Sequence, residues 1–125
     1  MKNIYASYID FSLISVGISI TVVPSQLELS TSFEVRCNIP LLAGIVNISK
    51  DGIVIGSCSP PIPGIINGEC LPNNLKQSIV SNDTIFTIES ANPAEHHGVW
   101  KCRHVLQETE KLITIYGNSN SYLLP

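Results

Sequence analysis

The stretch His96-His97-Gly98-Val99-Trp100-Lys101-Cys102 decides the fold of this chain. Successive side chains of a strand point to opposite faces, so Trp100 and Cys102 share one face of a strand over these residues. An aromatic ring and a cysteine on one face are typical of a buried wall. The run Phe33-Glu34-Val35-Arg36-Cys37 alternates in the same way and ends in a second cysteine. We expect the two stretches to be strands in facing layers of a β-sandwich.

Length and composition set the class of protein. A chain of 125 residues forms one domain with a sizeable core. Only 14% of the residues are charged, the net charge is −3, and the seven basic residues are scattered. These values predict no nucleic-acid partner and no basic surface for a membrane. Abundant Val, Ile, Ser and Thr, with a single Met, favour strands over helices.

The cysteines and two sequons indicate the cellular compartment. The four cysteines are Cys37, Cys58, Cys70 and Cys102. No two of them form a CxxC pair, and three pairings are open to them. Asn47-Ile48-Ser49 and Asn82-Asp83-Thr84 are acceptors for N-glycosylation. Together these features predict an oxidising, extracellular location, either secreted or on the cell surface.

The chain divides into three parts. Residues 1–17 are expected to be a leader remnant or a disordered N-terminus, because Asp10 interrupts the apolar stretch and no cleavage site of the usual kind follows. Residues 18–116 form the domain, and residues 117–125 are expected to be a linker or tail. The apolar run 11–23 is too short for a transmembrane helix of about 20 residues, so no membrane span is expected in this chain.

The pattern of the central part predicts an all-β fold without a helix. Strands are expected at 18–24, 26–30, 33–38, 44–49, 53–58, 75–80, 84–88, 96–102 and 111–116. Asp51-Gly52 is a strong hairpin signal, residues 92–95 are read as a turn, and residues 106–110 as a polar connection. Residues 59–74, rich in proline and glycine, are read as a loop. Short strands with turn signals every 8–12 residues suit a two-sheet sandwich.

The chain resembles an immunoglobulin-superfamily domain over roughly residues 18–116. Cys37 and Cys102 match the pair that joins strands B and F. Gly98-Val99-Trp100-Lys101-Cys102 matches the G-x-Y-x-C run of strand F, with Trp100 in the place of the tyrosine. Phe86-Thr87-Ile88 matches strand E. The resemblance implies a Greek-key sandwich with a Cys37–Cys102 disulfide, and Gly98 and Trp100 at its core and corner. An additional Cys58–Cys70 pair resembles Ig-like domains of invertebrate secreted or surface proteins.

The chain also departs from the family pattern at two places. Strand C lacks the usual tryptophan, so Val46 or Ile48 is expected in that core position. Trp100 is expected to refill part of the volume, and its indole N–H then requires an acceptor. His96 stands where the family has an aspartate, which adds mild pH sensitivity to this corner.

Catalysis and metal binding are set aside. The residues His96, His97, Cys102 and His104 resemble metal ligands, but adjacent histidines on a strand face opposite sides and Cys102 is expected in the disulfide. The sequence has no nucleophile elbow, P-loop or HExxH motif. The chain is therefore not expected to be an enzyme or to hold a cofactor.

Two segments are candidate contact sites. The loop 59–69 carries Ile62, Ile65 and Ile66, which either form an exposed contact patch or fold inward over the volume of the missing tryptophan. Glu108 lies in the 103–110 connection, where family members often carry recognition residues.

The resulting prediction is an extracellular, non-catalytic domain for recognition or adhesion, including immune recognition, within a larger glycoprotein. Its expected partner is another protein or a glycan, with Ig or lectin-like domains as neighbours. Two alternatives are a structural spacer, and a small secreted inhibitor or toxin-like protein that acts through the 58–70 loop. Fold alone does not choose among these functions.

Overall fold

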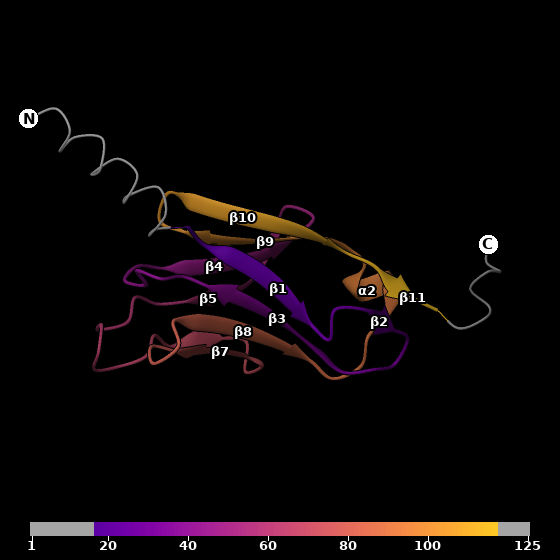
Figure 1. Cartoon of the computed structure of the whole chain (residues 1–125), viewed down its shortest axis with the longest axis horizontal. Coiled ribbons are helices and arrows are strands. Elements are labelled where there is room, and N and C mark those ends of the chain that lie inside the picture. The colour runs from indigo at the N-terminus through magenta and orange to yellow at the C-terminus, as the bar shows by residue number, and fades with distance from the viewer. Residues whose placement is uncertain (1–16, 118–125) are drawn as a thin grey trace, which may run out of the picture.

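The computed structural model describes residues 17–117, which form an all-β domain (Figure 1). The elements are β1 (Ser19–Val23), β2 (Leu27–Glu28), β3 (Phe33–Asn38), β4 (Val46–Lys50), β5 (Ile53–Cys58), β6 (Cys70–Leu71), β7 (Leu75–Ser78), β8 (Asp83–Ile88), α2 (Pro93–His96), β9 (Gly98–His104), β10 (Gln107–Ile113) and β11 (Ile115–Tyr116). The predicted first and last parts of the chain, residues 1–17 and 117–125, lie almost wholly outside the described residues.

The strands form two main sheets. The four-stranded sheet has the order β1-β3-β8-β7, and the five-stranded sheet has the order β10-β9-β4-β5-β6. Neighbours in both sheets are antiparallel. The short strands β2 and β11 add a parallel pair. The two layers are seen in Figure 1, and their edges contact each other on both sides: β1 contacts β10, and β7 contacts β5 and β6.

Alternating burial in β3 and β9 builds the core between the sheets. Phe33, Val35 and Cys37 are buried while the residues between them are partly exposed. In β9, Trp100 and Cys102 face inward and Val99 faces outward. A disulfide joins Cys37 to Cys102 across the two sheets, and both cysteines are fully buried. As expected from the sequence, β3 and β9 belong to different sheets, and the two sheets face each other across the core.

Trp100 fills the centre of the core. Its side chain is 1% exposed and makes edge-to-face contacts with Phe33 and Phe86, at centroid distances of 6.5 and 5.8 Å. The acceptor required by its indole N–H is the backbone oxygen of His96, at 2.8 Å. Val46 and Ile48 of β4, the two candidates for a core position in this strand, are both buried. This network ties the core to the segment before β9.

One predicted connection is wrong. Residues 106–110 were expected to be a polar linker, but most of them belong to β10, and only Val105 and Leu106 form the turn from β9. Val105 has a φ of 57°, which closes the hairpin tightly. Polar residues suit β10 because it is an edge strand whose outward side chains pair with those of β9, and such a strand lacks an apolar period.

Two smaller predictions are also wrong. Residues 93–96 form a single helical turn, α2, so the strand expected from residue 96 begins at Gly98. Asn92 caps this turn by accepting the backbone N–H of Ala94, and Pro93 suits its first position. The strand expected at 26–30 is shorter, because β2 covers only Leu27 and Glu28, and Leu29 beyond it is 39% exposed. No helix within residues 17–117 is long and apolar enough to cross a membrane.

Candidate functional site

The strand registers bring four loops to one end of the sandwich. Asn38, the last residue of β3, is opposite Asp83, the first residue of β8. Val46 at the start of β4 is opposite both Cys58 and His104, which end β5 and β9. Residues 39–45, 59–69, 79–82 and 105–106 therefore share one end, on the left in Figure 1, which we call the loop end.

Hydrogen bonds connect these loops to one another. The N–H of Ile39 donates to the backbone oxygen of Asn82 at 2.9 Å, and Nδ2 of Asn82 donates to the oxygen of Pro40 at 3.1 Å. The N–H of Ile79 donates to Oδ1 of Asn67 at 2.8 Å. The 79–82 turn is thus bonded to two of the other three loops, so the loop end is one connected surface.

His104 attaches the 39–45 loop to β9. Its Nε2 accepts the backbone N–H groups of Ala43 and Gly44, at 3.2 and 2.9 Å. An imidazole nitrogen that accepts has no proton, so the proton of the neutral ring is on Nδ1. Burial lowers the pKa of His104 below its ordinary value of 6.5, which favours this neutral form. Within residues 17–117, no group of three His, Cys, Asp or Glu side chains is placed to hold a metal.

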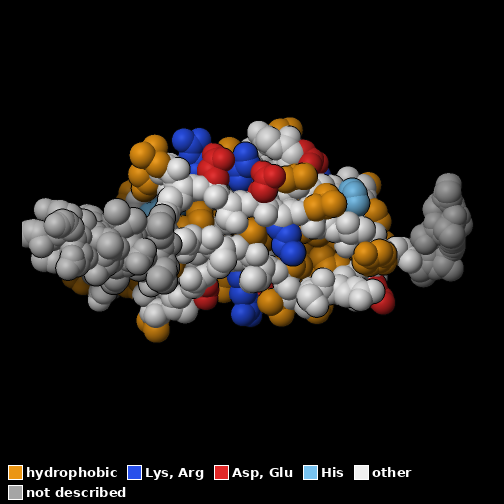
Figure 2. Space-filling model, turned by 45° about the horizontal axis from the view of Figure 1, so that its top comes forward, with side chains coloured by type: hydrophobic (Ala, Val, Ile, Leu, Met, Phe, Trp, Pro, Cys, Tyr) orange, Lys and Arg blue, Asp and Glu red, His pale blue; other side chains and the backbone are white. Residues whose placement is uncertain are grey.

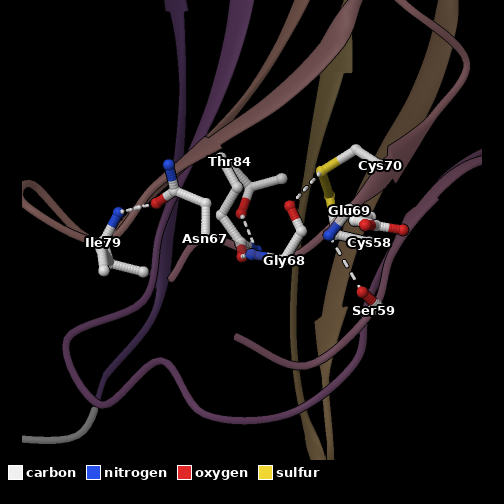
Figure 3. Close-up of a disulfide and its surroundings, with 9 residues drawn as sticks. Cys58, Ser59, Asn67, Gly68, Glu69, Cys70, Ile79 and Thr84 are labelled. Atoms are coloured by element: carbon white, nitrogen blue, oxygen red, sulfur yellow. Dashed lines mark hydrogen bonds between the residues drawn. A yellow bond between two sulfur atoms is a disulfide. The ribbon is translucent and has the colours of Figure 1, made fainter. Parts of the chain in front are cut away.

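The base of the 59–69 loop is braced in several ways (Figure 3). A disulfide joins Cys58 to Cys70. Between them, Ser59 and Glu69 exchange two hydrogen bonds of 2.9 Å, one of them through the Ser59 hydroxyl. The N–H of Gly68 donates to Oε1 of the buried Gln77 at 2.8 Å. A Cβ at Gly68 would collide with the backbone carbonyl of Ser59, so the close approach requires glycine.

The tip of this loop exposes its three isoleucines. Ile62, Ile65 and Ile66 are 50%, 72% and 54% exposed. A β-bridge between Ile62 and Ile66 folds the tip, and Gly64 turns the chain with a φ of 76°. The alternative in which the isoleucines fold inward is therefore wrong, because the core volume is already filled from β4 and β9 and the braced base directs the tip outward.

Other aliphatic side chains at the loop end were missed in the sequence. They are Leu41, Ile45, Val80, Val105 and Leu106, all more than half exposed. Their separate loops are short and unremarkable in sequence, and only the registers place them together. The absence of charge from 39–45, 79–82 and 105–106 is a signal that was present in the sequence.

Glu108, predicted as a ligand contact, lies apart from the isoleucines on β10. Its carboxylate is 3.6 Å from both Lys101 and Arg103 of β9. Acidic and basic side chains lie next to one another in a band across the surface shown in Figure 2. Glu108 therefore belongs to a set of exposed ion pairs, each of small energetic value.

The two sequons lie in different surroundings. Asn47 is half-buried on β4, opposite Ser57 and Arg103 in the neighbouring strands. Asn82 is in the turn between β7 and β8 with a φ of 62°, and its Nδ2 is the atom bonded to Pro40. Glycosylation at either residue stays a prediction.

The opposite end of the molecule, which we call the turn end, has a different character. It consists of residues 24–32, 51–52, 72–74 and 89–97, which contain Glu28, Asp51, Glu89, Glu95, His96 and His97. The Asp51 carboxylate accepts the N–H of Val99 at 2.9 Å and contacts Nζ of Lys50 at 3.1 Å. The Val99 bond is the main reason that the pKa of Asp51 lies below its ordinary value of 3.8.

The sequence matches no protein-family model and no curated protein. The chemistry of the two ends is therefore the basis for a functional proposal. The loop end combines a braced, connected backbone with exposed aliphatic side chains, which is an arrangement suited to contact with an apolar partner.

Proposed function

We propose that this protein is an extracellular, non-catalytic domain for recognition or adhesion, with an immunoglobulin-like Greek-key sandwich. The loop end is its contact surface. The observation that carries the proposal is the exposure of Ile62, Ile65 and Ile66 on a loop that the Cys58–Cys70 disulfide closes. A rigid loop loses little conformational entropy on binding, so its exposed apolar area is available for affinity.

An extracellular location is supported by the disulfides. Two disulfides in a domain of this size are typical of oxidising compartments and rare in the cytosol. The two sequons agree with this location. The structural role of all four cysteines also supports a non-catalytic function, because the described residues contain no free thiol.

The loop end favours an apolar partner over a glycan. Sugar recognition depends on hydrogen-bonding side chains, and the tips of these loops present Ile, Leu and Val instead. The spacer alternative makes the opposite prediction, namely that the loop tips serve no contact. The inhibitor-like alternative shares the contact loop and differs in having no neighbouring domains.

Cell binding tests the proposal. The oxidised, fluorescently labelled protein is titrated onto cells of the organism that produces it. The triple variant Ile62→Ser/Ile65→Ser/Ile66→Ser is titrated beside it. The matched control is Ile53→Ser/Val54→Ser, which changes two exposed side chains on β5. We expect at least tenfold weaker binding for the triple variant alone. Equal binding by all three proteins, with unchanged circular dichroism, would support the spacer function instead.

A further inference from the structure

We propose that the loop end inserts its aliphatic side chains into the hydrocarbon of a lipid bilayer. This inference rests on the proposed function, in which the loop end is the contact surface, and it names the partner. Insertion of this kind is peripheral: loop tips enter the boundary between headgroups and acyl chains while the sandwich stays in water.

The first argument is the composition of the surface. Eight aliphatic side chains are exposed at the loop end: Leu41 63%, Ile45 51%, Ile62 50%, Ile65 72%, Ile66 54%, Val80 94%, Val105 57% and Leu106 88%. They come from all four loops. Residues 39–45, 59–69, 79–82 and 105–106 contain one charged side chain, that of Glu69 at the base of its loop. Because the loop tips carry no charge, they enter hydrocarbon without the cost of burying ions.

The second argument is the type of apolar residue. Energetically dominant residues of protein interfaces are enriched in Trp, Tyr and Arg, whereas Leu and Val are under-represented. The four loops contain no Trp, Tyr, Phe or Arg. Aliphatic side chains without aromatic or arginine anchors fit an acyl-chain environment, in which burial of apolar area needs no directional contact.

The third argument is the backbone of the 59–69 loop. In hydrocarbon, a backbone N–H without a hydrogen-bond partner is energetically unfavourable, because no water is present to accept it. Pro60, Pro61 and Pro63 have no N–H, which leaves eight donors among these eleven residues. Six of the eight donate within the protein, namely those of Ser59, Ile62, Ile65, Ile66, Gly68 and Glu69. Most backbone N–H groups of the 59–69 loop are therefore already hydrogen-bonded within the protein and would not lose a water partner on insertion.

The charges around the loop end determine which lipids it accepts. Arg103 near the 105–106 turn is paired with Glu108, and Glu69 and Asp83 add negative charge at the base of the loops. Among the described residues, this rim has no basic cluster that would recognise anionic headgroups. The turn end carries four carboxylates and is the end turned toward solvent. Binding is therefore expected on neutral membranes, driven by apolar burial and insensitive to salt.

Vesicle flotation with the full, oxidised chain tests the inference. The vesicles contain phosphatidylcholine alone or an equal mixture of phosphatidylcholine and phosphatidylserine, at low and high NaCl. The variant Ile65→Ser/Leu106→Ser removes two prominent side chains. The control is Ile53→Ser/Leu112→Ser, which changes two exposed side chains near the turn end of β5 and β10. We expect binding of the unaltered chain to both vesicles, within twofold at the two salt concentrations. The loop-end variant should bind at least tenfold more weakly, and the control should be unchanged.

Each other result overturns the inference. Equal flotation of the loop-end variant would assign binding to another part of the chain. Strong dependence on phosphatidylserine or salt would assign it to charge. Failure to bind vesicles, together with cell binding that requires the isoleucines, would leave the proposed function standing with a protein as the partner. Failure in both experiments would remove both proposals.

Discussion

The two ends of this sandwich expose different side chains, although hydrogen bonds join loops to loops and loops to strands at both of them. At the turn end, Asp51 and the carbonyl of His96 bind groups of β9, so loop residues are drawn onto the sheets. At the loop end, Asn67 and Asn82 bind other loops. The side-chain amides of Asn67 and Asn82 are thus hydrogen-bonded to neighbouring loops, and the exposed loop tips are aliphatic. One framework therefore presents an acidic end and an end whose loop tips are apolar and uncharged.

The largest effect expected of a single substitution is in the core beneath the turn end. Trp100→Ala removes the central ring and leaves a cavity among Phe33 and Phe86, so we expect a loss of about 3–5 kcal/mol in the free energy of unfolding. Val99→Ala on the outer face of the same strand is the control and should cost less than about 1 kcal/mol. Urea unfolding measures both, and similar losses would contradict the central role of Trp100.

The two disulfides allow the stability of the whole domain to be separated from the stability of the 59–69 loop. In the loop-entropy model, the 65-residue separation of Cys37 and Cys102 is worth about 4 kcal/mol and the 12-residue separation of Cys58 and Cys70 about 3 kcal/mol. Reductant should therefore unfold the domain well below its oxidised melting temperature. Cys58→Ala/Cys70→Ala should keep the fold but lose up to about 3 kcal/mol and weaken loop-end binding. Equal melting with and without reductant would contradict this account.

Alanine substitutions at one glycine of each end show how the cost of a left-handed backbone conformation depends on neighbouring atoms. Gly98 has a φ of 152°, and a Cβ there would meet the Asp51 carboxylate, so Gly98→Ala should cost about 1–3 kcal/mol. Gly64 at the loop tip has a φ of 76° but open space around it, so Gly64→Ala should cost about 1 kcal/mol from the backbone alone. Urea midpoints of the two variants measure the difference. A larger loss for Gly64→Ala would contradict the contact with Asp51.

The smallest expected effect is on pH dependence. Burial lowers the pKa of His104 and of His96 below 6.5 in the folded state. Folding therefore favours the neutral rings: their contribution to stability is complete above about pH 6.5 and is lost as the pH falls through the lowered folded pKa. His104 would lose its acceptor nitrogen, which holds the 39–45 loop.

Urea midpoints at pH 7.5 and 5.0 check this sign. Unaltered protein should be less stable at pH 5.0, and His104→Gln and His96→Gln should each reduce the difference. Exposed His97 provides the variant His97→Gln, which controls for the effect of the substitution itself on the midpoint at pH 7.5. A higher midpoint at pH 5.0 than at pH 7.5 for the unaltered protein would contradict the expected direction.

The sequence predicted those strands in which one buried face produces an alternation of apolar and polar residues. The alternation around Cys37 and Trp100 identified the buried faces of β3 and β9, and Asp51-Gly52 marked the hairpin, whose residues have φ values of 50° and 85°. The β10 strand escaped prediction because its side chains are mostly polar on both faces, and its extended form depends on pairing with β9.

The candidate site was predictable only in part. Three isoleucines in a proline-rich loop were visible, but their direction depends on Gly68 and Gln77 at the base of the loop, whose contact joins residues nine positions apart. The connection from His104 to Gly44 spans sixty residues and has no local signature. Contacts of this kind become visible only when the strand registers are known.

The chain contains a single tryptophan, and its position has a spectroscopic consequence. Trp100 is buried and bonded to a backbone carbonyl beneath the turn end, far along the strands from the loop tips. Its fluorescence should be that of an indole shielded from water, with emission at short wavelength, and should report unfolding of the core. The four loops carry no tryptophan or tyrosine. The protein thus has a natural optical reporter for its interior and an optically silent contact surface, where one introduced fluorophore would be read against a constant background.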